Sequence, residues 1–334
     1  MRKRLIRDLE VSPIGMGCMG FSHGYGPAPE ESYSIEAIHK AYDFGCTFFD
    51  TAESYGREQF WPGHNEQLAA KALEPVRKNV VLATKLHIQE QEAENSPVYE
   101  VVRRHLEQSM KNLRTDYIDL YYLHRVNQGV PVEDVAAAMG RLIEEGLIRG
   151  WGLSQVDVDT LDRAHKVTPV TAVQNLYNML ERDCEAEIFP YCLEHNIGVV
   201  PFSPIASGFL SGKITVETRF DQKDDVRSWV PQLKKENIAA NQPVLDVLSR
   251  YSQAKKATPA QISLAWMLHK YPNVVPIPGS RNQERILENL GGWNVRLTGE
   301  EFAGLEQALN ACTVHGHRGH VETEAASFSS NWRK

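Results

Sequence analysis

The chain has 334 residues, of which 42% are hydrophobic and 24% charged, which is enough apolar material for a sizeable core. Its formal net charge of -7 argues against a nucleic-acid partner, because phosphate binders carry a basic excess. Few cysteines, an N-terminus without an apolar signal-peptide core and no run of about 18 apolar residues lead us to expect a cytoplasmic protein without membrane insertion.

Short runs rich in β-branched and aromatic residues alternate with amphipathic stretches along the chain. Residues 5–12 precede them, and we interpret this segment as a hairpin that closes the bottom of a barrel. The predicted strands are, in chain order, residues 12–16, 47–49, 80–83, 118–122, 150–153, 172–174, 198–202 and 274–277. The predicted helices are residues 32–44, 98–113, 132–145, 158–166, 185–195, 259–269 and 283–290.

Strand-then-helix repetition of this kind is typical of a parallel sheet with helical crossovers. It predicts an α/β fold, the (β/α)8 or TIM barrel. Helix ends agree with this interpretation, since Thr258 precedes Pro259 at a helix start, and Gly45 and Gly146 follow helical runs. No Pro/Gly/Ser-rich linker divides the chain, so we expect one domain over residues 1–334, with a polar tail from about residue 310.

Two segments need a separate interpretation. From Ser203 to about Thr258 the sequence predicts a long loop after the seventh strand, which is either a functional lid or binding loop or a solvated insertion. Residues 15–20 match G-x-G-x-x-G, but a dinucleotide-binding fingerprint opens directly into a helix. The next helical pattern begins only near Ser32, so we interpret these glycines as shaping the end of a barrel strand.

Four polar residues, Asp50, Tyr55, Lys85 and His124, stand at or just beyond predicted strand ends. In a barrel these ends surround one mouth, where active sites are built. Tyrosine is a weak acid with a pKa of ~10, and a neighbouring ammonium such as Lys85 lowers that pKa. Asp50 can orient the lysine, and His124 can form a hydrogen bond with a carbonyl oxygen. Carbonyl reduction needs that oxygen stabilised and protonated, so the group predicts this reaction with Tyr55 as proton donor.

A second pattern favours a nucleotide phosphate near the last strand. Gly279 lies just before the predicted helix at 283–290, where free backbone N–H groups and the helix dipole attract anions. Arg281 and Arg285 add cationic contacts suited to the 2′-phosphate of NADPH, although a capped surface helix with ordinary arginines is the alternative. Phe202, at the end of the seventh strand, can stack on a flat ring.

At these positions the chain resembles the aldo-keto reductase superfamily over nearly its full length. The most specific stretch is GCTFFDTAESYG, which begins at Gly45 and carries Asp50 and Tyr55. LATK, YYLHR, GWGLS, VQNLYN, VVPFSPIASGFLSGK and IPGSR with ERILEN follow in the family's order. The SPIASGFL loop is most similar to the branch of bacterial, yeast and plant reductases and potassium-channel β-subunits.

The resemblance implies an NADP-dependent alcohol oxidoreductase that reduces aldehydes or ketones. Tyr55 would be the general acid, Lys85 and Asp50 would tune it, and His124 would orient the substrate. The residues that the resemblance assigns to NADPH or NADP+ binding are Gly17, Cys18, Met19, Ser154, Gln155, Gln174, Phe202, Ser203, Ile205, Ser207, Leu210, Ser211, Lys213, Gly279, Ser280, Arg281, Arg285, Glu288 and Asn289.

Within this set, Ser154 and Gln174 would hold the nicotinamide carboxamide. The residues that would line the pyrophosphate path are Ser203, Ile205 and Ser207, with Leu210 and Ser211 nearby. The 2′-phosphate would be bound by Ser280, Arg281 and Arg285, and the adenine would be contacted by Glu288 and Asn289.

The chain departs from the family pattern at three of these positions. Gln155 stands where the family usually has Asn, and Phe202 replaces the usual Tyr or Trp. Gly279 stands where many members have Lys, which leaves the phosphate to the arginines.

The substrate pocket is expected to be apolar or aromatic, which favours small-molecule aldehydes or ketones with such groups. The alternative interpretation is that some of the candidate residues belong to the core or to a lid and do not contact substrate. The candidates, all from predicted strand-end loops, are Met19, Phe21, Tyr25, Trp61 and Trp229.

Two other classes of protein compete with the reductase. A metal-dependent hydrolase needs clustered His and Asp ligands at strand ends, and His124 alone meets that need, so no metal is expected. The run at 315–320 with three histidines also suggests a metal site, but a polar tail explains it as well. A redox-sensing binding subunit is the third class, although intact Tyr55, Lys85 and His124 imply turnover. The sequence leaves the oligomeric state open.

Overall fold

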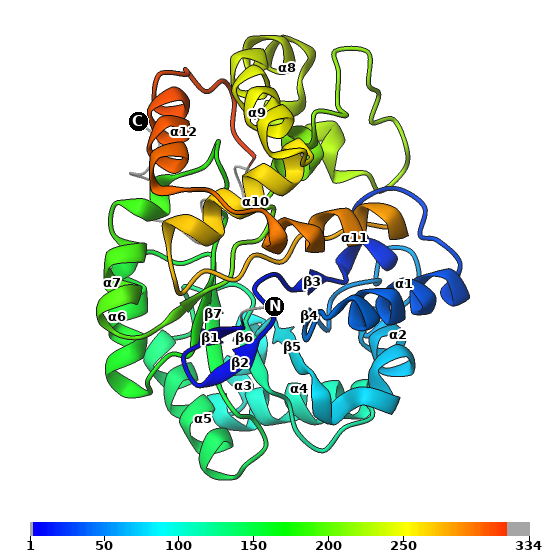
Figure 1. Ribbon diagram of the computed structural model, residues 1–334. Coiled ribbons are helices and arrows are strands. Elements are labelled where there is room, and N and C mark those ends of the chain that lie inside the picture. Colours follow the sequence, from blue (N-terminus) through cyan, green and yellow to red (C-terminus); the bar gives the residue numbers. More distant parts are fainter. Residues whose placement is uncertain (1–2, 319–334) are drawn as a thin grey trace.

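Seven parallel strands form a curled sheet in the structure, a computed structural model that describes residues 3–318. Helices cover the outside of this sheet (Figure 1). The architecture is the predicted (β/α)8 barrel. In spatial order the strands are β3 (Met16–Gly17), β4 (Phe48–Asp50), β5 (Val81–Leu86), β6 (Leu120–Leu123), β7 (Trp151–Ser154), β8 (Ala172–Gln174) and β9 (Gly198–Val199).

Residues 274–277 complete the ring between β9 and β3 but do not form the regular strand that the sequence predicted. The Val275 N–H donates to a β9 carbonyl at 2.8 Å, and the Gly15 N–H, just before β3, donates to Pro276 O at 2.9 Å. Pro276 and Pro278 have no N–H, so the hydrogen-bond ladder is interrupted. The prediction was therefore right about the position of this segment and wrong about its regularity.

The predicted helices are present, two of them with identical bounds, and only residues 185–195 are broken, by a 3-10 turn before α7. Thr258 forms a capping box at one helix start, and Gly45 ends another with a left-handed φ of 112°. The helices are α1 (Glu31–Phe44), α2 (His64–Leu73), α3 (Glu90–Asn95), α4 (Val98–Leu113), α5 (Val132–Glu144), α6 (Val158–Val167), α7 (Ile188–Glu194), α8 (Lys235–Ala240), α9 (Gln242–Lys255), α10 (Pro259–Lys270), α11 (Gln283–Leu290) and α12 (Gly299–Asn310).

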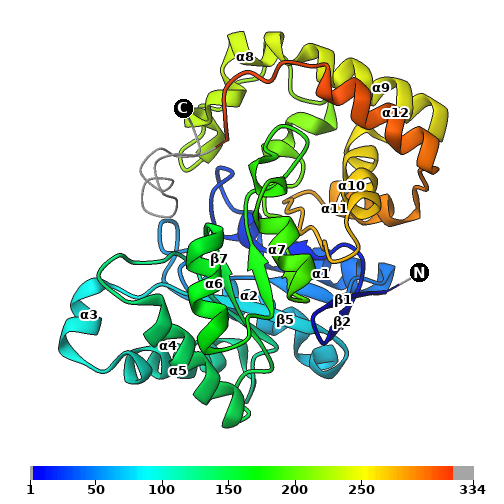
Figure 2. The same cartoon turned by 90° about the vertical axis from the view of Figure 1, so that its left-hand side faces the viewer.

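Residues 203–258 are not the single long loop that the sequence predicted, because they include α8 and α9. Helix α9 buries Val244, Val247 and Leu248 at helical spacing, and it lies beside α12 at one end of the molecule (Figures 1 and 2). The stretch before α8 reaches the barrel mouth instead, where Asp225 forms an antiparallel bridge with Tyr25. A covering loop is thus confined to the first half of the segment.

An antiparallel hairpin of β1 (Arg4–Ile6) and β2 (Leu9–Val11) closes the bottom of the barrel, as predicted. Ile6, Leu9 and Val11 are buried in one apolar cluster with side chains from the barrel interior. A Cβ atom added to Gly198 would lie only 2.6 Å from the Ile6 side chain, so the hairpin fits tightly against β9. The hairpin is therefore part of the core.

Replacing Ile6 by Ala should lower the free energy of unfolding by about 2–5 kcal/mol, because it leaves a cavity in a closely packed core. Urea denaturation measures this loss. The matched control is Leu5→Ala on the opposite face of β1, where the side chain is 57% exposed and the expected change is below about 0.5 kcal/mol. Equal effects of the two substitutions would contradict a plugging role for the hairpin.

The glycine-rich stretch at residues 15–20 does not open into a long helix. It contains β3 and enters a 3-10 turn at Met19–Phe21, and α1 begins only at Glu31. The rejection of a dinucleotide-binding fingerprint is therefore confirmed.

The described part of the C-terminal tail packs on the region of α8 and α9. His315 and Asn241 exchange two hydrogen bonds of 2.8 and 2.9 Å. His320, the last histidine of the run that suggested a metal site, lies outside the described residues. Within residues 3–318, no helix combines the length and apolar character that crossing a membrane requires.

Candidate active site

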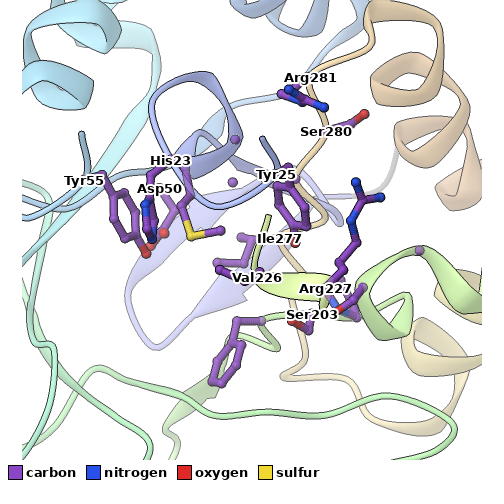
Figure 3. A pocket seen from close by; sticks show the side chains of 18 of the residues that line it. His23, Tyr25, Asp50, Tyr55, Ser203, Val226, Arg227, Ile277, Ser280 and Arg281 are labelled. Atoms are coloured by element: carbon purple, nitrogen blue, oxygen red, sulfur yellow. The ribbon is translucent and has the colours of Figure 1, made fainter. Parts of the chain in front are cut away.

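A cavity of about 840 Å³ opens at the carboxyl ends of the barrel strands. Asp50, Tyr55 and His124 line it, together with residues from the loops after β3, β9 and the segment at 274–277. Figure 3 shows Tyr55, Asp50 and His23 gathered at one end of the pocket, with Ser280 and Arg281 away from them. A volume of this size accommodates a large ligand.

Lys85 connects Asp50 and Tyr55 in one hydrogen-bonded group. Its side chain is fully buried behind the cavity wall and pairs with the carboxylate of Asp50 on the neighbouring strand β4. The Lys85 ammonium also donates to Thr51 O at 2.7 Å and to the Tyr55 hydroxyl at 3.4 Å. Gln174 donates to the other Asp50 oxygen at 2.8 Å. Strand pairing therefore brings together residues that lie far apart in sequence.

The charge state of this group follows from burial and from the ion pair. Burial alone would lower the pKa of Lys85, but Asp50 and Tyr55 outweigh it and raise that pKa, so the ammonium is retained. Burial raises the pKa of Tyr55 above its usual value, and Lys85 opposes this rise. The expected lowering by Lys85 is present, but it does not overcome burial here. Tyr55 is therefore a protonated donor.

His124 lies at the end of β6 with its ring at the edge of the Tyr55 ring. The ring centroids are 5.7 Å apart and the ring planes meet at 82°. The His124 N–H donates to Leu86 O at 2.8 Å, which fixes the backbone between two strands. Burial, reinforced by the charges of Arg125 and Lys85, holds the pKa of His124 well below its usual range. The imidazole is consequently neutral at pH 7.

The residues expected around a nicotinamide, Ser154, Gln155, Gln174 and Phe202, all line the cavity. Gln155 has a left-handed φ of 59°, and its side-chain oxygen accepts from Leu176 N at 3.2 Å. Gln174 is already hydrogen-bonded to the Asp50 carboxylate. The Gln155 side chain therefore forms an ordered contact between neighbouring loops.

The loop after β9 forms a cradle of left-handed backbone. Ser203, Ala206 and Ser207 have φ values of 48°, 48° and 54°, and Gly208 follows at 98°. The Ser207 hydroxyl is buried in the cavity wall and has no hydrogen-bond partner among residues 3–318. Left-handed turns of this kind expose N–H groups to anions, and an unpaired buried hydroxyl suits a polar ligand.

The opposite wall comes from the start of α11. Asn282 caps this helix by accepting from the Arg285 N–H at 2.9 Å, and Ser280, Arg281 and Arg285 line the cavity. The Arg281 guanidinium donates to the Pro27 carbonyl. Gly279 approaches Gly17 so closely that an added Cβ would lie 3.1 Å from the Gly17 oxygen. A helix N-terminus flanked by two arginines can bind a phosphate.

Most of the predicted cofactor and pocket residues meet in this one cavity, including Met19, Tyr25, Ile205, Ser211, Trp229 and Asn289. Several others do not line it. Phe21, Cys18 and Leu210 are buried in the core, Trp61 is half exposed outside the cavity, and Lys213 and Glu288 form an ion pair of 2.9 Å beside it.

Sequence reasoning missed several residues that line the cavity. Arg125 carried a usable signal, since it follows His124 directly at a strand end. His23, Arg227 and Arg318 come from segments without periodic patterns, so tertiary structure alone brings them to the site. His23 lies in the loop after β3 and contacts two other loops. Its Nδ1 atom is 3.1 Å from Glu58 in the loop after β4 and 3.4 Å from Asp224 in the stretch before α8.

Comparison with known proteins identifies the family. The model of the Aldo/keto reductase family matches residues 13–310. A curated relative, probable aldo-keto reductase 1 from Glycine max, is 38% identical over 318 residues, which cover 93% of this chain and 89% of the relative. The chain belongs to the aldo/keto reductase family and is therefore an oxidoreductase.

Two solved structures extend this likeness to three dimensions. A glycerol dehydrogenase from Gluconobacter oxydans matches with a TM-score of 0.80 at 27% identity, covering 94% of this chain and 96% of that one. An aldo/keto reductase from Klebsiella pneumoniae, in complex with NADP and acetate, matches with a TM-score of 0.71 at 25% identity, covering 96% and 99%.

Proposed function

We propose that this protein reduces aldehydes or ketones to alcohols with NADPH, with Tyr55 as the proton donor. The observation that carries the proposal is the buried group in which Lys85 contacts both Asp50 and the Tyr55 hydroxyl at the cavity wall. Family membership and the NADP bound by the Klebsiella pneumoniae relative support the choice of cofactor.

The residues present fit NADPH. The unpaired Ser207 hydroxyl and the left-handed backbone around it would bind the pyrophosphate. Arg281 and Arg285 would bind the 2′-phosphate, and Phe202 would stack on the nicotinamide. Bound NADPH would supply a hydride to the carbonyl carbon.

The chain's own residues would manage the charge and the proton. As hydride reaches carbon, the electron pair of the C=O bond moves to oxygen, and Tyr55 transfers its hydroxyl proton to that oxygen. The Lys85 ammonium stabilises the resulting phenolate, and neutral His124 orients the carbonyl oxygen by a hydrogen bond. Water then restores the proton of Tyr55.

NADPH oxidation in the presence of an aldehyde panel, followed by absorbance, tests the proposal. Turnover with several aldehydes supports it, and absence of NADPH binding contradicts it. A redox-sensing subunit, the second candidate, would bind NADPH without turnover.

Replacing both Arg281 and Arg285 by Ala should weaken NADPH binding by on the order of 100-fold, since two charge-assisted hydrogen-bond donors are lost. NADH, which lacks the 2′-phosphate, should lose less than about threefold. Fluorescence titration with each cofactor measures the two changes.

The control is Arg219→Ala, because that arginine donates only to nearby backbone carbonyls on an exposed loop. Equal losses for NADPH and NADH in the double variant would show that the two arginines do not recognise the 2′-phosphate.

A further inference from the structure

Arg125 brings a positive charge to the cavity beside the catalytic group. Its Nη1 atom donates to His124 O at 2.5 Å and to Ser154 Oγ at 3.1 Å, and both acceptors are neutral. Within residues 3–318 its guanidinium forms no ion pair, although it is partly exposed to the cavity. Burial lowers the pKa of Arg125 to about 10, which still leaves it protonated at pH 7. A cation of this kind, without a carboxylate, is unusual in a protein interior.

Arg318, in the C-terminal segment, adds a second cation to the cavity. Its Nε atom donates to Ser203 Oγ at 3.1 Å, and its guanidinium carbon lies 5.9 Å from the centroid of the Phe202 ring. Arg318 lines the same cavity, and its charge contributes to the lowered pKa of Arg125. The two guanidinium groups therefore bring like charges into one cavity, where a bound anion would be favoured.

Among residues 3–318, the other charged side chains that line the cavity form no ion pair with Arg125 or Arg318. The two carboxylates among them are already engaged, Asp50 by Lys85 and Glu58 by Arg57 and His23. Among the other arginines of the wall, Arg227 pairs with Asp225, and Arg281 and Arg285 are assigned to the cofactor. Among the described residues, the Arg125 guanidinium therefore has no carboxylate partner, and it lies next to His124 and Ser154.

We propose that Arg125, aided by the charge of Arg318 in the same cavity, binds a carboxylate on the carbonyl substrate. This inference rests on the proposed function and names its substrate class, aldehydes or ketones that also carry a carboxylate. A planar guanidinium pairs with a carboxylate through parallel N–H donors, which fixes orientation as well as position. Since Arg125 adjoins His124 and Ser154, a carboxylate held there keeps the carbonyl of the same molecule near Tyr55. The hydride and proton steps are those of the proposed reaction.

Matched substrates test this inference on the full-length protein. The carboxylates are 3- and 4-carboxybenzaldehyde, and the neutral controls of nearly equal shape are 3- and 4-formylbenzamide. The wild-type protein should have a kcat/KM at least about tenfold higher for the better carboxylate than for its amide, because a charge-assisted pair replaces a neutral contact. Arg125→Met should remove that ratio mainly through KM, and Arg125→Lys should restore part of it.

Further variants separate the subsite from other roles. Arg318→Met should reduce the carboxylate-to-amide ratio less than Arg125→Met does. Arg57→Met should leave the ratio unchanged, since that arginine lines the cavity but already pairs with Glu58 at 2.9 Å. NADPH affinity, measured by fluorescence, should change less than about threefold in Arg125→Met.

Three results would overturn the inference while leaving the reductase intact. They are equal turnover of carboxylate and amide by the wild type, an equal loss for both in Arg125→Met, and a parallel loss of NADPH binding in that variant. If no aldehyde of either kind is reduced, the proposed function itself fails. If Arg125→Met folds poorly, Arg125→Lys takes its place. In that variant, a carboxylate-to-amide ratio of kcat/KM and a KM for the carboxylate that both stay unchanged as ionic strength rises would contradict an ion pair.

Discussion

Tyr55→Phe should lower kcat/KM for carbonyl reduction by on the order of 1000-fold, because the variant has no proton to give to the carbonyl oxygen. The loss should appear in kcat, since the phenyl ring keeps the packing of Tyr55 against His124, whose ring centroid is 5.7 Å away. NADPH affinity should be retained. Steady-state kinetics combined with fluorescence titration of NADPH measure both quantities.

The control for Tyr55→Phe is a tyrosine of the same barrel whose hydroxyl lies away from the cavity. Tyr121 on β6 is fully buried between the sheet and the helices, so Tyr121→Phe removes the same atom elsewhere. Its kcat/KM should change less than about threefold. Near-normal turnover by Tyr55→Phe would mean that another group protonates the substrate, and the assignment of the acid would be wrong.

Lys85→Met should affect both chemistry and stability. Without the ammonium, the phenolate of Tyr55 has no adjacent cation, so kcat should fall by on the order of 100- to 1000-fold. The variant also leaves the buried Asp50 carboxylate without its partner, which should cost about 3–5 kcal/mol of unfolding free energy at pH 7. Kinetics and urea denaturation measure the two losses.

The pH dependence of Lys85→Met follows from the same pair. Burial raises the pKa of Asp50, and Lys85 opposes that rise, so the folded-state pKa should rise further in the variant. For a carboxyl group with a raised folded-state pKa, stability is greatest when it is protonated and falls as pH rises through that pKa. The deficit relative to wild type should therefore be smaller at pH 5 than at pH 7.

Lys71→Met is the matched control, because Lys71 forms an exposed ion pair of 2.7 Å with Glu31 on the surface. Its stability should change by less than about 1 kcal/mol at either pH. Full activity and unchanged stability in Lys85→Met would contradict the central role given to the buried pair.

The sequence predicted the barrel because strand and helix periods alternate regularly, and α4 and α11 were predicted with identical bounds. It missed α2, because polar Asn65 and Glu66 are buried there and blur the amphipathic pattern. Their partners lie elsewhere in the chain, with Thr51 donating to Asn65 and Thr84 donating to Glu66, each at 2.6 Å. Such compensation depends on tertiary structure and has no local signal.

In the candidate site, too, the residues with a local sequence signal were predicted and those placed by tertiary structure were not. Asp50, Lys85 and His124 were predictable because each lies at or next to the end of a strand, and barrel geometry brings strand ends together. Phe21 and Trp61 were placed in the pocket because their loops lead there, but local turns direct Phe21 into the core and Trp61 towards Gln67. Arg318 was not predicted, because only the return of the C-terminal tail across α8 brings it to the cavity.

The most direct measurement of the central claim is NADPH oxidation by the wild-type protein with aromatic and aliphatic aldehydes, carboxylates among them, with the alcohol product quantified. NADPH binding is titrated by fluorescence in parallel. We predict one alcohol formed for each NADPH consumed, with several aldehydes. Tight NADPH binding with no turnover of any aldehyde would contradict the reductase and favour the redox-sensing subunit, and absence of NADPH binding would contradict both.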